Sequence, residues 1–506
     1  MQREDPHSTR LTDVRQLGTF AAIGSLGYVF WVCGGMEMIE RLAYYGVRQV
    51  SGLYATDAAS RGGLGLVESD LGIIFAVWAV TQTFVPVFTG GISDRIGYKR
   101  TIFGSTVIKI CGYLLMAWLP TFWGFLTGAV VLAIGTGFFK PGIQATIVKS
   151  TNRRNSSIAW GVFYQTVNIG AFLGPPVAAQ MRQLAWENVF YACAGIIALN
   201  FLLLLSYREP GREPGATPAD RIAQASLVRE SLNELKNPVL LWYVLLFAGF
   251  FFMLYVIWDV GPLFFRDWVD TRPLVQGLFG TDGTRNPIWI FFFGLNRDGT
   301  QMMPEGLINL NAMMIMFVCF LIAGFGARLK ATNSMALGTL FASTALLIFA
   351  GYTYVWMIVA AIVIFSLGEM LSSPKSSEFI GNIAPADKKA MYLGFSQLPI
   401  GIGWSLESYL GPTLYGEFAS KDRIAAALLE ERGLSAPVGE AFQRLVEVTG
   451  QTPDALTAQL YAANHIGAVW YLMASVGFVT AFGLYRYGRW IYAQAARSGA
   501  LQPAAA

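Results

Sequence analysis

The chain has 506 residues, of which 54% are hydrophobic and 13% are charged, and its formal net charge is +4. An average soluble domain carries about 25% charged residues, so this composition excludes an ordinary soluble protein and indicates a chain surrounded by lipid. The small net charge gives no indication of a nucleic-acid partner.

Apolar segments long enough to cross a hydrocarbon core about 30 Å thick recur along the whole chain. They predict an all-α membrane protein with twelve transmembrane helices. The predicted spans are 22–53, 69–92, 100–119, 122–147, 157–180, 187–207, 238–268, 305–327, 333–351, 354–381, 390–417 and 463–488. The polar stretch 1–21 lacks the pattern of a signal peptide, so we expect it to be a tail and the first span to be retained.

The spans divide into two six-helix halves, predicted at 22–207 and 237–490. The segment 208–236 between them is rich in Pro and Gly and then amphipathic, which favours a linker. Two longer connections, 269–303 and 418–462, interrupt the second half. The later one has a helical pattern with a cap-like start at Thr452, so we expect a small helical hairpin there. A structural cover is favoured for it over capture of a substrate or partner.

Alternate short loops are rich in Lys and Arg, whereas the opposite short loops hold only Arg61 and Arg182. Basic loops remain in the cytoplasm during insertion. This asymmetry predicts a multi-pass protein of the plasma (inner) membrane with both termini, including the tail 491–506, in the cytoplasm.

A stripe of charged and aromatic residues runs along the first span. Its members lie at offsets 0, 3, 4, 7, 8 and 11, which share one face of an α-helix: Glu37, Glu40, Arg41, Tyr44, Tyr45 and Arg48. An ionised side chain near the centre of a spanning helix costs roughly 2.5–3.5 kcal/mol, so this face cannot point at lipid. The stripe is typical of a binding wall in a polar cavity. A neutralised packing cluster that fixes the helix register is the alternative.

Polar residues also occur inside later spans. They are Lys140 in the fourth, Tyr164 and Asn168 in the fifth, Asp259 in the seventh, Asn311 in the eighth, and Glu369, Ser372 and Ser373 in the tenth. Asparagines alone are equally explained by hydrogen bonds between helices. The acids of the second half and the bases of the first predict two ion pairs that act as a gate, Arg48 with Asp259 and Lys140 with Glu369.

Several motifs carry a resemblance to known families. The segment Gly90-Gly91-Ile92-Ser93-Asp94-Arg95-Ile96-Gly97-Tyr98-Lys99-Arg100 resembles the signature loop of the major facilitator superfamily. The first-span pattern Glu37-x-x-Glu40-Arg41-x-x-Tyr44-Tyr45-Gly46 resembles a motif of the proton-coupled oligopeptide transporter (POT/PTR) family, with Leu42 in place of the usual phenylalanine.

Three further segments resemble the fourth-, fifth- and tenth-span motifs of the same family. They are Gly135-Thr136-Gly137 through Lys140-Pro141, Phe163-Tyr164-x-x-Val167-Asn168-x-Gly170, and Gly368-Glu369-x-x-Ser372-Ser373-Pro374. The match is closer in the first half than in the second, where the seventh span lacks the family's glutamine-rich stretch.

The resemblance implies a major facilitator fold and a symporter that imports di- and tripeptides together with protons by alternating access. Arg48 and Lys140 would then hold the peptide carboxylate, and Glu369, with Ser373 beside it, the amino terminus. The remaining implied contacts are Asn168 and Asn311 to the peptide backbone, and Tyr44, Tyr45 and Tyr164 around the side chains.

Proton coupling is expected to use carboxylates, because neither histidine of the chain lies in the predicted cavity. Burial raises and a neighbouring cation lowers the proton affinity of a carboxylate, so making and breaking ion pairs moves protons. The coupling residues are expected to be Glu37, Glu40, Arg41, Asp259 and Glu369. Protons serve as the coupling ion, and no cofactor or metal is expected.

Three other functions remain open. One is a major facilitator carrier of another small zwitterion, anion or drug, including an exporter, and another is a transport-deficient peptide sensor. A membrane-embedded enzyme is disfavoured because the sequence contains no metal-ligand spacing, nucleophile elbow or phosphate-binding loop. The partners expected are small peptides, protons and the lipid bilayer, and the protein is expected to function as a monomer.

Overall fold

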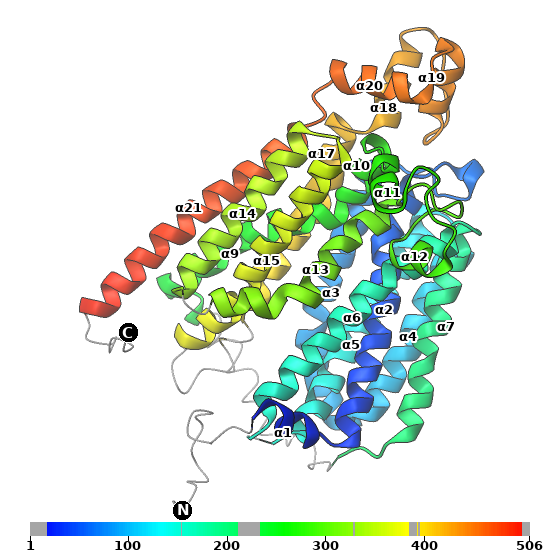
Figure 1. The fold of residues 1–506 in the computed structure, drawn as a ribbon. Coiled ribbons are helices and arrows are strands. Elements are labelled where there is room, and N and C mark those ends of the chain that lie inside the picture. The colour runs from blue at the N-terminus through cyan, green and yellow to red at the C-terminus, as the bar shows by residue number, and fades with distance from the viewer. Residues whose placement is uncertain are drawn as a thin grey trace, which may run out of the picture.

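The computed structural model describes residues 18–152, 154–210, 233–326, 329–383, 392 and 395–497, and its regular elements are helices. The long helices are α2 (Tyr28–Thr56), α3 (Glu68–Ile96), α4 (Tyr98–Trp118), α5 (Phe122–Ser150), α6 (Ser156–Arg182), α7 (Trp186–Ser206), α9 (Pro238–Asp259), α13 (Pro304–Gly326), α14 (Ala331–Gly351), α15 (Val355–Ile383), α17 (Gln397–Phe418) and α21 (Ala468–Arg497). Each corresponds to one of the twelve predicted spans. The prediction of an all-α protein with two six-helix halves is confirmed (Figure 1).

Eight of these helices are long and apolar enough to cross a membrane by length and composition alone. Helix α13 contributes a shorter apolar stretch, Pro304–Cys319. The remaining three, α2, α6 and α17, are more polar, and α2 carries the charged stripe. Polar spanning helices need polar neighbours rather than lipid, so the site is to be sought among them.

Some predicted boundaries are wrong in detail. The first span is divided at residues 25–27 into α1 (Thr19–Gly24) and α2. The seventh is divided into α9 and α10 (Gly261–Trp268), because Pro262 at the start of α10 has no N–H to continue the helical ladder. The loop expected between 92 and 100 is reduced to Gly97, whose φ of 103° is accessible to glycine at little cost.

The two longer connections are folded. The first contains α11 (Arg272–Phe279) and α12 (Pro287–Phe292). The second forms three helices rather than the expected hairpin, α18 (Lys421–Glu430), α19 (Ala441–Thr449) and α20 (Pro453–Ala463). The cap expected at Thr452 is confirmed, since its hydroxyl accepts a hydrogen bond from the backbone N–H of Ala455.

We call the end of the bundle that carries α11, α12 and α18–α20 the capped end, and the opposite end, where α1 and the last turn of α21 lie, the terminal end (Figure 1). The halves pack against each other through α3 with α17 and α6 with α13. Toward the terminal end the ribbons of the two halves lean apart (Figure 1). Residues 211–232 of the expected linker, 1–17 of the first tail and 498–506 of the last lie outside the described residues.

Candidate functional site

The stripe on α2 is buried inside the first half. The exposed fractions are 5% for Glu37, 1% for Glu40 and 5% for Arg41. The Arg41 guanidinium lies between the two acids, with Nε 3.1 Å from Glu37 Oε1 and Nη2 2.5 Å from Glu40 Oε2. The helical spacing of the three residues makes this bridging possible, since positions three and four apart face the same side.

A second cation completes this cluster from α4. Lys109 is fully buried, its Nζ is 3.3 Å from Glu40 Oε1, and it lies 3.8 Å from the centre of the Phe139 ring. A side chain at Gly135 would collide with the Lys109 stem, so the glycine of the fourth-span motif provides room for it. Sequence reasoning missed Lys109. Its signal is a lone lysine in the middle of the third span, which by itself indicates function.

Lys140 lies close to the same cluster. It is within electrostatic range of Glu37, Glu40 and Arg41, and no carboxylate among the described residues is within 4.0 Å of its amine. The predicted pair with Glu369 is therefore not formed in this conformation. Three cations, Arg41, Lys109 and Lys140, face two carboxylates, so the cluster has one positive charge in excess when both acids are ionised.

Glu369 lies on the opposite half. Asn311 donates from Nδ2 to Glu369 Oε2 at 3.0 Å and to Ser366 Oγ at 3.0 Å. Glu369 is also within electrostatic range of Tyr45 and Tyr164, which belong to the first half. Among the described residues it has no ion-pair partner. An acid of the second half is thus held by a neutral amide.

The other predicted contact residues differ in their burial and in their partners. The Tyr164 side chain is 52% exposed even though it lies within range of Glu369. The Asn168 amide nitrogen is buried without a hydrogen-bond partner. Tyr44 packs edge-on against Tyr45 at 5.3 Å, and Tyr45 lies 6.4 Å from Trp258 of the other half. Ser373 is half-buried, while its neighbour Ser372 bonds the Met335 carbonyl on α14.

Arg48 and Asp259 form the other predicted cross-half pair. The guanidinium of Arg48 contacts Asp259 Oδ1, and Ser408 donates to Asp259 Oδ2 at 2.8 Å. Aromatic rings surround the guanidinium, with the centres of Phe75, Trp78 and Trp404 at 4.0, 5.4 and 5.9 Å. Both partners are buried, so breaking the pair by removing one of them would be costly. The remaining charge would then have neither water nor a counter-charge.

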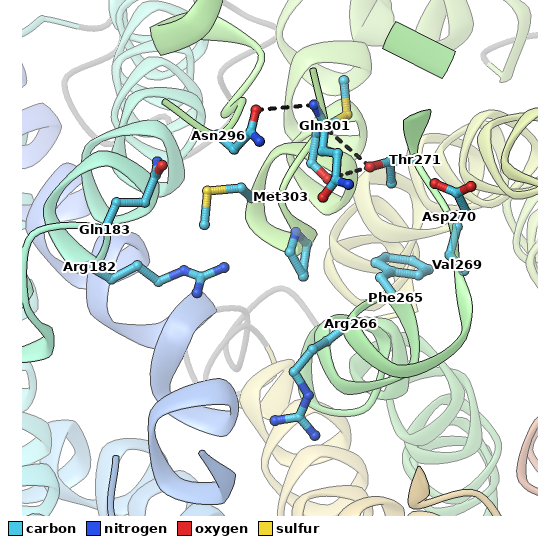
Figure 2. A pocket seen from close by; sticks show the side chains of 12 residues that line it. Arg182, Gln183, Phe265, Arg266, Val269, Asp270, Thr271, Asn296, Gln301 and Met303 are labelled. Atoms are coloured by element: carbon cyan, nitrogen blue, oxygen red, sulfur yellow. Dashed lines mark hydrogen bonds between the residues drawn. The ribbon is translucent and has the colours of Figure 1, made fainter. Parts of the chain in front are cut away.

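Additional cross-half contacts lie nearer the capped end. Arg182 of α6 bonds Glu305 of α13 with Nη2 to Oε2 at 3.0 Å, and Arg266 of α10 donates to Thr56 Oγ1 at 2.8 Å. A pocket of about 280 Å³ lies at the same seam. Figure 2 shows Arg182 and Gln183 on one side of this pocket and Arg266 on the other.

Along the rest of the seam, Asn309 bonds the Phe172 carbonyl at 2.9 Å and Gln165 bonds the Met316 carbonyl at 3.0 Å. Cross-half hydrogen bonds and ion pairs thus occur at the capped end and along the seam as far as Gln165, the tenth residue of α6. The conformation is therefore closed at the capped end.

The predicted signature loop joins α3 to α4 and meets the end of the first half. The Lys99 amine donates to the Tyr207 carbonyl at 2.7 Å, and the Tyr98 N–H donates to Glu209 Oε1 at 2.9 Å. Gly97 lies between the helices and Arg100 is exposed. Gly90, Gly91, Asp94 and Arg95 belong to α3, and the side chains of Asp94 and Arg95 lie outside the described part of the structure.

Comparison with known proteins gives one family model, that of the Major Facilitator Superfamily, which matches residues 42–408. Dipeptide and tripeptide permease A of Proteus mirabilis is 22% identical over 448 residues, 77% of this chain and 86% of the relative. A multidrug resistance protein of Edwardsiella ictaluri is 21% identical over 358 residues, 70% of this chain and 79% of the relative. By contrast, the match to an uncharacterized transporter of Bacillus subtilis, 25% identical over 201 residues, spans 39% of this chain and only 40% of that protein.

Among solved structures, a POT family transporter in complex with 5-aminolevulinic acid superposes with a TM-score of 0.67 at 16% identity. The superposition covers 93% of this chain and 99% of the other. At this identity the likeness establishes the overall fold, and the expected arrangement of two packed six-helix halves is confirmed.

Proposed function

Because the chain belongs to the major facilitator superfamily, we propose that it is a proton-coupled symporter that imports di- and tripeptides by alternating access. One observation carries the proposal. Lys140 of the first half and Glu369 of the second both lack an ion-pair partner among the described residues, and Tyr45 lies within electrostatic range of both Glu369 and the cluster on α2. A zwitterionic peptide carries the two charges that this arrangement lacks.

The carboxylate of the peptide binds at Lys140. The excess positive charge of the cluster favours an anion there, and Lys109 and Arg41 are already engaged by Glu40. Arg48 becomes available as a second contact when its pair with Asp259 opens. The amino group binds Glu369, whose orientation is fixed by Asn311.

Contacts to the middle of the peptide come from amides and aromatic rings. The unpartnered Asn168 Nδ2 and Asn311 Oδ1 offer a donor and an acceptor for a peptide bond. Tyr164 and Tyr45, both within range of Glu369, line the space for side chains, and Ser373 lies on the same helix as Glu369. Contacts to backbone groups with loose side-chain pockets give broad substrate range.

Proton coupling arises from competition for shared cations. Glu37 has one close cation, Arg41, whereas Glu40 has two, Arg41 and Lys109. Glu40 is thus the more firmly held as an anion, and Glu37 is the member of the pair that accepts a proton when Arg41 shifts. The proposed driving force is the proton gradient, to which the membrane potential adds about 2.3 kcal/mol per charge per 100 mV.

The proposed setting follows from the loop charges. The basic connections lie at the terminal end, so this end faces the cytoplasm and the capped end faces outward in the plasma (inner) membrane. The structure then corresponds to a state closed to the outside. Residues 208–236 act as the linker between halves, and one copy of the chain is sufficient for transport.

Uptake by purified protein in liposomes tests the function. Dialanine and trialanine should accumulate when the outside is acidic, and accumulation should stop when a protonophore removes the gradient. Absence of uptake together with measurable peptide binding would instead indicate a peptide sensor.

A second candidate is a carrier of another small molecule with an amine and a carboxylate. The solved POT family structure with 5-aminolevulinic acid favours it, because that ligand presents the same two charges. Because the chain is also similar to a multidrug resistance protein, drug export is a further function to be tested. Competition of labelled dialanine uptake by 5-aminolevulinic acid, free amino acids and drugs separates these functions.

A further inference from the structure

A carboxyl group outside the predicted site lies at the seam between the halves. Glu407 on α17 is fully buried, and neither of its oxygens has a hydrogen-bond partner among the described residues. Helix α17 packs both on α9 of its own half and on α3 of the other. An ionised carboxylate in this position would lose its hydration without gaining a hydrogen bond.

The neighbour of Glu407 is the acid of the cross-half pair. Its carboxyl lies within hydrogen-bonding reach of Asp259, and the charged groups that act on it are Asp259 and Arg48. Asp259 already accepts from Arg48 on one oxygen and from Ser408 on the other. Two carboxylates and one guanidinium in a buried pocket leave one uncompensated negative charge.

The room for this carboxyl is built into the helix. A side chain on Gly411, one turn further along α17, would collide with Glu407 Oε1 and would lie 3.2 Å from Val260. The nearby Trp404 N–H also lacks a partner. The pocket is therefore shaped around a carboxyl group that the described contacts leave without a hydrogen-bond partner.

We propose that Asp259 and Glu407 form a carboxyl pair that must bind one proton for the capped end to close. With the proton on Glu407, its O–H donates to Asp259, and the group of three becomes neutral. Opening the seam admits water, Glu407 ionises, and the proton leaves to that water. This inference rests on the proposed transport function in one respect: the carboxyl pair would be a second binding place for the coupling proton, apart from the α2 cluster.

Distance measurement across the capped end tests this without any substrate. Spin labels at Leu119→Cys and Tyr352→Cys occupy exposed turns of the two halves, 46% and 50% accessible. Cys111 and Cys319 are replaced by Ser, while Cys33 and Cys193 are buried and are kept. Because one proton binds on closure, a rise in pH should favour the open state. The open-to-closed ratio should increase by up to tenfold for each unit that the pH rises across the titration of the pair.

Glu407→Gln should stay closed from pH 5 to pH 9, because the amide donates to Asp259 at every pH. Glu407→Met, which fills the space without a charge, should do the same and guards against a folding defect of the amide variant. The control Glu417→Gln removes an exposed acid of the same helix and should keep the wild-type response. A wild-type pH response in both Glu407 variants, or none in the wild-type protein, overturns the proposal.

Uptake in liposomes separates this proposal from the proposed function. Loss of the pH response in the Glu407 variants of a protein that transports no peptide supports the proton site and rejects peptide transport. Peptide uptake together with an unchanged pH response in those variants rejects the proton site alone.

Discussion

The charged faces of the two halves are built in different ways. In the first half, acids and bases from α2 and α4 neutralise one another at contact distance, as Glu40 does with Arg41 and Lys109. In the second half, the acids Asp259, Glu369 and Glu407 come singly from three helices, and Asp259 takes its cation from the other half. The acids of the first half therefore have their cations within the same half, whereas those of the second half depend on the other half, a substrate or a proton.

Lys140→Ala should have the largest effect, because it removes the cation that the cluster leaves for a substrate. Loss of a charged contact costs about 2–5 kcal/mol, so kcat/KM for dialanine should fall about 30-fold or more. Lys140→Arg keeps the charge and should retain measurable uptake. Liposome uptake at saturating and low dialanine checks both variants, and unchanged transport by the alanine variant would remove Lys140 from the site.

Glu37→Gln should separate transport from its driving force. The amide cannot exchange a proton, so accumulation in a pH gradient should fall by roughly tenfold or more while counterflow exchange of peptide persists. Paired uptake and counterflow assays on the same liposomes measure this. Normal accumulation by the variant would mean that the α2 cluster does not carry the coupling proton.

Lys109→Met should sharpen the contrast between the halves. The change removes the excess positive charge while Arg41 still neutralises Glu40, so the KM for dipeptides should rise about tenfold with a smaller change in kcat. Lys99→Met offers a matched control, since this lysine lies at the junction of α3 and α4 and bonds a backbone carbonyl. Equal effects of the two substitutions would contradict a role for Lys109 in attracting the carboxylate.

Ser408→Ala should have the smallest effect of the series. It removes one hydrogen bond from Asp259 and leaves Arg48 in place, a loss of about 1 kcal/mol. The spin-label distance across the capped end should show a several-fold shift toward the open population. The neighbouring Ser405→Ala serves as a comparison, because the Ser405 hydroxyl has no hydrogen-bond partner among the described residues.

The charged groups of the two halves also differ in how much of their arrangement could be predicted from sequence. The α2 stripe was predictable because helical spacing alone places Glu37, Glu40 and Arg41 on one face, and their contacts in the structure follow that spacing. Arg48 with Asp259 could be anticipated because a base and an acid occur in opposite halves. Lys109 could have been found by the same rule applied to single charges in apolar spans.

Other features depend on packing that no local pattern encodes. The contact of Glu407 with Asp259 joins positions on two helices far apart in the sequence. The unformed pair of Lys140 and Glu369 reflects the conformation rather than the residues, since the two halves lean apart toward the terminal end (Figure 1). The predicted helix boundaries were wrong at Pro262 and Gly97, because these residues change the backbone geometry.

The folded connection that holds α18–α20 has a mechanical consequence. It belongs to the second half by sequence, yet Arg61 of the first half donates to its Gly439 carbonyl at 2.9 Å, and Ser60 bonds its Glu440. Gly439 has a φ of 82° and packs on Ala58, so the contact fits closely. Exposed polar contacts of this kind contribute about 0–1 kcal/mol each. Under the proposed alternating access, this connection would hold the two halves together only weakly, and a nanobody that bridged residues 58–61 and 439–440 should stop transport without entering the substrate path.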